Sequence, residues 1–248
     1  MNRITGTIIT LNEEKNIAAC IKSLQPVCDE IIVVDSESKD RTVEIANDLG
    51  AKVITQSYLG DGPQKLFAAK QAKNNWIICL DADERIDDEL ITSIQQLDLD
   101  TSPYDAYFIN RKTYIGDEWI KVWYPEKIAR LYNSKTANYK PSIGHATVSH
   151  KKSSQLNGHI LHYSFSNYAE LLNQTTKFCI RDANVFNEKN KKVGALDPFL
   201  HALTAFIRKY IFKKGILYGE SGLTISITTA YRTYMKYVIA RRHYLKKY

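Results

Sequence analysis

Short apolar runs alternate with amphipathic segments over the first 80 residues, and this order constrains the fold more than any other feature of the sequence. The runs typical of strands cover residues 4–11, 30–34, 52–55 and 76–80. Apolar residues at helical spacing occupy the intervals between these runs, as over 17–24. Strands that alternate with helices form parallel sheets with right-handed crossovers. We therefore predict an α/β fold with a mostly parallel, Rossmann-like sheet.

Polar residues mark the predicted helix boundaries. Asn12 is placed to cap the first helix, with Glu13 in its first turn, and the helix is expected to stop before Pro26. Asp40 or Ser38 is expected to cap the second helix. The segment 60–63, which holds two glycines and a proline, is predicted to be a loop before a third helix.

The pattern changes after residue 100. Tyrosine-rich strands are expected at 104–115, 129–132 and 160–163, and they would extend the sheet in mixed orientation. Helices are expected at 167–186, 198–213 and 220–246. We predict a first domain over 1–165, with one half at about 1–100 and a second half at about 101–165. A basic helical extension over 166–248 follows it.

Positive charge is concentrated at the C-terminal end of the chain. The net charge of the 248 residues is +7, and Glu220 is the one acidic residue among ten Lys and Arg over 208–248. Basic and aromatic residues on amphipathic helices suit the surface of an anionic membrane, whereas ordinary packing of these helices is an equal alternative. Binding to nucleic acid is not expected, because no recognised motif supports it.

Cysteine usage and hydropathy indicate a cytoplasmic protein. The four cysteines form no C-x-x-C pair, which is typical of free thiols in a reducing compartment. The N-terminal residues run directly into a strand pattern, and no run of 18 apolar residues is present. We expect a cytoplasmic location, and peripheral contact with the cytoplasmic face of the inner membrane is one interpretation of the basic helices.

Two carboxylates follow the apolar run 76–80. Asp81 and Asp83 are expected to point to the same side of the chain, because side chains alternate along a strand. Like charges at one strand end repel each other unless a cation lies between them. Carboxylate oxygens in an open site suit Mg²⁺ or Mn²⁺. Thr10, Asn12 and Asp35 follow other strands at the sheet edge where α/β proteins bind ligands.

These motifs together resemble family 2 glycosyltransferases, which have a GT-A fold. The resemblance is carried by Thr10-Leu11-Asn12-Glu13, by Val34-Asp35-Ser36-x-Ser38-x-Asp40-x-Thr42 and by Leu80-Asp81-Ala82-Asp83-Glu84-Arg85. The branch that adds β-glucose to the lipopolysaccharide core is similar in Gly60-x-Gly62-Pro63-Gln64-Lys65, in Trp123-Tyr124-Pro125-Glu126 and in Arg130-Leu131. The resemblance implies inverting transfer of a hexose, with glucose as first candidate, from a UDP-sugar. The implied acceptor is a saccharide or lipid-linked glycan of the cell envelope, first of all the lipopolysaccharide inner core.

The resemblance also implies that 1–165 is the catalytic domain, with the nucleotide-sugar half at about 1–100 and the acceptor half at about 101–165. It further implies roles for individual residues. The expected nucleotide-sugar contacts are Asp35 to the uracil, Lys65 to the base or diphosphate, Thr10, Asn12 and Glu13 beside the nucleoside, Asp81 to the ribose or a metal-bound water, and Arg130 to the leaving diphosphate. The expected ligands of a divalent metal are Asp83, Asp81 and His162. His159 lies three positions before His162 on a strand, so the two face opposite sides, and His159 is expected to be structural.

The general base of an inverting reaction is the least defined residue. Glu126 is the first candidate, because it belongs to the Trp-Tyr-Pro-acid motif, and His145 is the second. Related sequences often place an acid directly after this histidine, where this chain has Ala146. The departure keeps a second hypothesis open, that of a non-catalytic envelope-assembly or membrane-associated protein with a GT-A fold.

Two other enzyme classes fit the motifs less well. A sugar-phosphate nucleotidylyltransferase usually has a glycine-rich phosphate loop after its first strand, and residues 10–13 contain no glycine. A phosphatase with an aspartate nucleophile would carry the D-x-D after the first strand, whereas here it follows the fourth.

Overall fold

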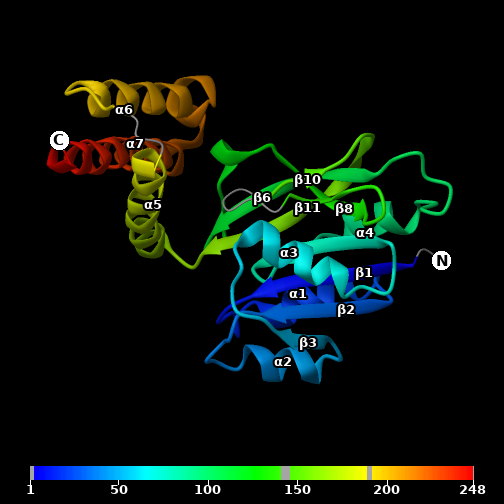
Figure 1. Cartoon of the computed structure of the whole chain (residues 1–248). Coiled ribbons are helices and arrows are strands. Elements are labelled where there is room, and N and C mark those ends of the chain that lie inside the picture. Colours follow the sequence, from blue (N-terminus) through cyan, green and yellow to red (C-terminus); the bar gives the residue numbers. More distant parts are fainter. Residues whose placement is uncertain (1–2, 141–145, 189–191, 248) are drawn as a thin grey trace. The chain divides into compact units, whose positions relative to one another are not determined.

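The computed structural model describes residues 3–140, 146–188 and 192–247. The chain forms two compact units, of which the first comprises Met1–Lys112 and Pro125–Tyr163 and the second comprises Thr113–Tyr124 and Ser164–Tyr248. Figure 1 labels most of the elements along the chain. The elements are β1 (Ile4–Thr10), α1 (Ile17–Leu24), β2 (Glu30–Asp35), α2 (Thr42–Asp48), β3 (Lys52–Thr55), α3 (Asp61–Lys70), β4 (Trp76–Asp81), β5 (Glu84–Ile86), α4 (Asp88–Gln95), β6 (Ala106–Ile115), β7 (Glu118–Trp119), η1 (Lys121–Trp123), β8 (Glu126–Asn133), β9 (Asn138–Tyr139), β10 (Val148–Ser149), β11 (Ser153–Phe165), α5 (Tyr168–Glu188), α6 (Asp197–Ile207), the π-helix η2 (Arg208–Phe212), η3 (Gly215–Tyr218) and α7 (Gly219–Lys247).

The first unit is built on one large sheet with the strand order β3-β2-β1-β4-β8-β6-β11-β5. Strands β1 to β4 pair in parallel, as the alternating pattern predicts, and β8 continues the sheet in antiparallel orientation beside β4. Successive side chains of β4 pack on opposite faces of the sheet. Ile78 and Leu80 pack in one cluster with Ile21 of α1, whereas Ile77 and Cys79 pack in another cluster with a residue of α3. The predicted α/β class is confirmed.

Three helix boundaries differ from the prediction. Helix α1 begins at Ile17, so the prediction that Asn12 caps it is wrong. Asn12 instead adopts a φ of 55°, and its side-chain oxygen accepts a hydrogen bond from the backbone N–H of Lys39 at 2.7 Å. Helix α2 begins at Thr42 with Arg41 at its cap position, so the prediction that Asp40 or Ser38 caps it is wrong. The Asp40 side chain lies one residue earlier and accepts a hydrogen bond from the backbone N–H of Thr42 at 3.0 Å. Helix α3 already includes the predicted loop, because a proline in the first helical turn loses no internal hydrogen bond.

A short strand and a helix that the sequence did not reveal follow the two aspartates. Strand β5 pairs antiparallel with β11, with Glu84 opposite His162 and Ile86 opposite Ile160. Helix α4 begins after Asp87, whose carboxylate accepts the backbone N–H of Leu90 at 3.0 Å. Three residues of strand are too few for a periodic signal, so pairing with a distant strand, rather than local pattern, defines β5.

Gly158 permits the close crossing of β11 and α4. Its φ is +89°, and a Cβ built there would lie 2.2 Å from the backbone nitrogen of Leu90. We expect Gly158→Ala to lower the free energy of unfolding by about 2–3 kcal/mol, since strained backbone and overlap add. Gly50→Ala is the matched control, because Gly50 has a φ of +78° with nothing within 4 Å, and it should cost about 1 kcal/mol. Urea unfolding of both variants measures the two changes in the free energy of unfolding. Equal decreases in the two variants would mean that the close approach to Leu90 adds nothing to the cost at Gly158.

The second unit consists of α5, α6 and α7 with β7 and the last residues of β6 and β11. Its core includes Ile115, Ile120, Val122, Leu171 and Ile225. Helix α6 packs along α7, as the orange and red segments of Figure 1 show. Over the described residues, no helix combines the length and the apolar character that crossing a membrane requires.

Candidate active site

The candidate site lies in the first unit, where β1, β2 and β4 end. Thr10 pairs with Asp35 across β1 and β2, and Ile9 pairs with Asp81 across β1 and β4, so the three strand ends lie side by side. A pocket of about 300 Å³ opens beside them. It is lined by Ile9, Thr10, Leu11, Glu13, Ser36, Tyr58, Asp81, Ala82 and Asp83. The parallel register therefore brings together residues from four separate stretches of sequence.

The Thr10 side chain gives this pocket an unsatisfied polar group. Its residue is 5% exposed, and its hydroxyl has no hydrogen-bond partner among the described residues. A buried hydroxyl without a partner destabilises the folded protein. A polar ligand that reached this hydroxyl from the pocket would remove that cost. Glu13 also lines the pocket, and its carboxylate accepts a hydrogen bond from the Asn16 side chain at 2.8 Å. The pocket wall thus offers a hydroxyl and a carboxylate to a polar ligand.

Asp35 and Asn12 organise the loops around the pocket. The buried Asp35 carboxylate accepts hydrogen bonds from both the backbone N–H and the hydroxyl of Ser38. The backbone N–H of Asn12 donates to that same hydroxyl at 2.8 Å. Ser36, rather than Asp35 or Asn12, lines the pocket. Both predicted nucleoside contacts therefore have partners within the protein and fix the shape of the two loops.

Asp81 is held between two cations. One of its oxygens lies 2.7 Å from Nζ of Lys65, and the other lies 2.8 Å from Nη2 of Arg130. Burial would raise the pKa of the Asp81 carboxyl, but the charges of Lys65 and Arg130 outweigh this effect and hold that pKa well below its usual value. Two neighbouring aspartates were expected to need a cation. For Asp81 the protein itself supplies positive charge, through Lys65 and Arg130.

Asp83 lies in the turn after β4 and pairs with a different residue. Its carboxylate is 3.2 Å from Nε2 of His162 on β11. Burial would lower the pKa of His162, but the hydrogen bond and charge of Asp83 outweigh it and raise that pKa above its usual value. The sequence placed Asp81 and Asp83 on the same side of one continuing strand. In the structure β4 ends at Asp81 and the chain turns, so strand alternation does not determine the direction of the Asp83 side chain. A carboxylate is a typical ligand of Mn²⁺ or Mg²⁺ and an imidazole is less so, so Asp83 and His162 fit the ligand set only in part. Asp81 lines the same pocket as Asp83 and would be the third ligand, with its two oxygens already on Lys65 and Arg130.

His159 points to another group of side chains. Its Nδ1 lies 3.0 Å from the carboxylate of Asp87, the cap of α4. Asp87, Glu89 and His159 offer ligand atoms that lie within 4.8 Å of one another. Asp87 also accepts hydrogen bonds from the backbone N–H groups of Leu90 and His159, which explains its conformation without an ion. The two histidines thus have different partners.

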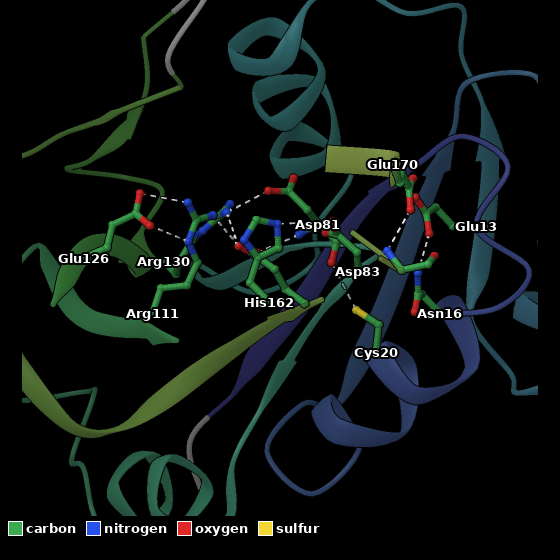
Figure 2. A network of polar contacts seen from close by, with 12 residues as sticks. Glu13, Asn16, Cys20, Asp81, Asp83, Arg111, Glu126, Arg130, His162 and Glu170 are labelled. Atoms are coloured by element: carbon green, nitrogen blue, oxygen red, sulfur yellow. Dashed lines mark hydrogen bonds and ion pairs between the residues drawn. The ribbon is translucent and has the colours of Figure 1, made fainter. Parts of the chain in front are cut away.

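A chain of alternating charges continues from Asp81 into the protein, as Figure 2 shows. Arg130 donates from the same nitrogen to Asp81 and to the fully buried Glu84, each at 2.8 Å. Arg111 donates to Glu84 at 2.9 Å and holds both oxygens of Glu126, at 2.8 and 3.1 Å. Burial would raise the pKa of Glu84, but Arg130 and Arg111 outweigh it and lower that pKa. Glu84 is therefore a buried carboxylate that stays charged, and its partners are fixed in position.

A second, larger cavity of about 540 Å³ shares Asp81, Lys65 and Arg130 with this network. Glu126 lines it, together with Asp61 and residues of β8 and β10. Asp81 also lines the 300 Å³ pocket, so the two cavities meet at this carboxylate. Glu126 forms its ion pair with Arg111. His145, the second candidate base, lies outside the described residues.

Sequence reasoning missed Glu84, Arg111 and Tyr139. Nη1 of Arg130 donates a hydrogen bond to the hydroxyl oxygen of Tyr139 at 3.4 Å. Nζ of Lys65 lies 5.7 Å from the centroid of the Tyr139 ring. One signal was present in the sequence, because Arg111 lies between Asn110 and Lys112 in the middle of a strand whose two ends are apolar and aromatic. A charged residue inside a strand that is buried on one face needs a buried partner of opposite charge.

Comparison with known proteins gives consistent results. Residues 7–154 match the model of glycosyl transferase family 2. An uncharacterized glycosyltransferase of Rickettsia typhi is 33% identical over 99% of this chain and 89% of its own length. A lipopolysaccharide core biosynthesis glycosyltransferase, LpsC of Rhizobium meliloti, is 32% identical over 45% of this chain and 43% of that protein. Residues 1–349 of TarS from S. aureus share the fold with a TM-score of 0.52 and 16% identity, over 100% of this chain and 92% of that one.

Proposed function

The chain belongs to glycosyl transferase family 2 and has the GT-A fold, and from its site we propose a metal-dependent, inverting transfer of a hexose from a UDP-sugar. The observation that carries the proposal is the 300 Å³ pocket, which is lined by Thr10, Asp81 and Asp83, and the buried hydroxyl of Thr10 has no hydrogen-bond partner among the described residues. Such a pocket suits a ligand that has both polar hydroxyl groups and negative charge, as a nucleotide sugar has.

The donor would occupy this pocket with its nucleoside beside Thr10 and Glu13. Glu13 would accept hydrogen bonds from ribose hydroxyls, and Thr10 would pair with the nucleoside or a phosphate oxygen. Asp35 would reach the uracil only if its oxygens accept a further hydrogen bond beside those from Ser38, which the lone pairs of a carboxylate allow. Asn12 would act through the loop that it shares with Lys39.

The diphosphate would lie near Asp83 and His162, which would hold the metal together with Asp81. A divalent metal supplies Lewis-acid neutralisation of the leaving diphosphate. Lys65 and Arg130 are the protein's own cations at this position, and their contacts with Asp81 orient them toward the junction of the two cavities. They would stabilise negative charge as it develops on the leaving group.

The acceptor would enter the 540 Å³ cavity, and a base there would take the proton of its attacking hydroxyl. Glu126 lines that cavity and stays the first candidate. Its two hydrogen bonds with Arg111 fix the position of the carboxylate. His145 stays the second candidate.

We propose glucose as the sugar and a cell-envelope saccharide as the acceptor, first of all the inner core of lipopolysaccharide. The partial likeness to LpsC of Rhizobium meliloti, named for lipopolysaccharide core biosynthesis, supports this choice. Such an acceptor is anchored in a membrane, so we also propose peripheral contact of the enzyme with an anionic membrane surface. The basic C-terminal helices support that contact.

A panel of nucleotide sugars, with and without Mn²⁺, tests the proposal by calorimetry and by slow release of UDP from the donor. We expect one UDP-sugar, UDP-glucose first, to bind at least about tenfold more tightly with the metal. Metal-independent binding would contradict the assigned roles of Asp83 and His162. Tight binding without release of UDP, even with an acceptor, would support the non-catalytic alternative.

A further inference from the structure

The second unit exposes large apolar side chains along one segment. They belong to α6 and to the two short helical turns that follow it. These residues, called here the 196–217 face, are Leu196, Phe199, Leu200, Leu203, Ile207, Ile211, Phe212, Ile216 and Leu217. Phe212 is 75% exposed and Leu217 is 70% exposed. Large apolar residues that are exposed together in one segment are typical of an interaction surface.

The spacing within α6 shows that this exposure is systematic. Leu196, Phe199, Leu200, Leu203 and Ile207 recur at three- and four-residue intervals and fall within an arc of about 100°, the usual width of the apolar face of a helix. The opposite side of α6 already packs on α7, through positions such as the buried 198 and 205. The helix therefore satisfies the core of its unit with one side and turns a second apolar side outward.

Positive charge is concentrated in the same segment of the chain. Arg208, Lys209, Lys213 and Lys214 lie within the same segment, and Asp197 is its one acidic residue from 196 to 218. Arg208, Lys213 and Lys214 are exposed. The Asp197 carboxylate accepts the backbone N–H of Gly194 at 2.7 Å, so it is engaged at the start of the helix. The segment thus combines an apolar stripe with cations and has almost no negative charge.

We propose that the 196–217 face docks on an anionic phospholipid bilayer, with α6 lying in the plane of the interface. The apolar stripe would enter the boundary between headgroups and acyl chains, and the three exposed cations, Arg208, Lys213 and Lys214, would contact phosphate groups. A second copy of the chain fits the face less well, because a symmetric contact would bring these same cations against one another. All residues of this surface belong to the second unit. The proposal depends on the proposed function only for the role of the surface, which is to bring the enzyme to a membrane-anchored acceptor.

Co-sedimentation with vesicles tests the proposal on the full-length protein without substrate. The vesicles are pure phosphatidylcholine, or equal parts phosphatidylcholine and phosphatidylglycerol. We expect wild-type protein to bind the anionic vesicles and to lose most binding in high salt. The apolar variant Phe199→Ser/Leu203→Ser should bind roughly tenfold or more weakly, since it removes inserted surface. The charge variant Arg208→Glu/Lys213→Glu should bind roughly 20-fold more weakly at low salt.

Leu172→Ser is the matched control, because Leu172 on α5 is 54% exposed, close to the 52% of Leu200, and lies outside the face. It should bind vesicles as the wild type does, and circular dichroism checks that all variants stay folded. Absence of vesicle binding by the wild type, or equal loss in the control, would overturn the proposal. Concentration-dependent dimers that the apolar variant abolishes, without vesicle binding, would assign the face to a second copy instead.

The donor assay separates this proposal from the proposed function. Both face variants should release UDP from a UDP-sugar at the wild-type rate, since the site residues lie in the first unit. Vesicle binding by a protein that binds no nucleotide sugar would overturn the proposed function and leave the membrane surface supported.

Discussion

Asp83→Ala is expected to lower the rate of sugar transfer by about 1,000-fold or more, while the protein remains folded. The carboxylate is the proposed metal ligand at the donor diphosphate, so its loss removes charge stabilisation that the reaction needs as the leaving group departs. The fold should tolerate the change, because Asp83 lies in a turn and its side chain contacts His162 through one hydrogen bond at 3.2 Å. Such a bond contributes about 1 kcal/mol to stability.

Transfer kinetics and calorimetric titration of Mn²⁺ check this together. His162→Ala should weaken the binding of Mn²⁺ in the same way, because the two side chains are proposed to share the ion. Asp88→Ala serves as the control, since it removes an exposed carboxylate only five positions further along, in the first turn of α4. Normal turnover by the Asp83→Ala variant would remove the basis for the metal site.

The parts of the fold that the sequence predicts are those that local pattern determines. The alternation of strands and helices over the first 80 residues defines β1 to β4, and the carboxyl ends of these strands meet because parallel strands must align. Thr10 and Asp81 could therefore be placed near one pocket without a structure. This placement needs only the order of the predicted strands and helices and the residue at which each apolar run ends.

The parts that sequence reasoning misplaces depend on partners far along the chain. Asn12 is a residue type that caps helices, yet its side chain bonds a loop 27 residues away. Glu84 is separated by 27 residues from Arg111 and by 46 residues from Arg130. The register of β8 and β6 decides which charges meet, and no local periodicity encodes that register. The charge on Asp81 was anticipated, but its protein partners were not.

Arg130→Met is expected to lower the free energy of unfolding by about 3–5 kcal/mol. Arg130 is 5% exposed and bonds both Asp81 and the fully buried Glu84. Removing it leaves carboxylates with less compensation in a region that water reaches poorly, and breaking a buried ion pair from one side carries this cost. Methionine preserves much of the side-chain volume, so the loss reports the charge rather than a cavity. The midpoint of thermal unfolding should fall by about 10 °C.

Arg41→Met provides the comparison that isolates burial. Arg41 and Glu44 form an ion pair at 2.8 Å, the same distance as Arg130 and Glu84, but both side chains are exposed. An exposed pair contributes little to stability, because water screens the two charges. In the double variant Glu84→Gln/Arg130→Met, the loss should be smaller than the sum of the two single losses, because neutralising Glu84 removes one of the two charges that Arg130 compensates. Equal losses for Arg130→Met and Arg41→Met would mean that the buried network contributes no more than a surface pair, and the rigidity that it is proposed to give Asp81 would need another source.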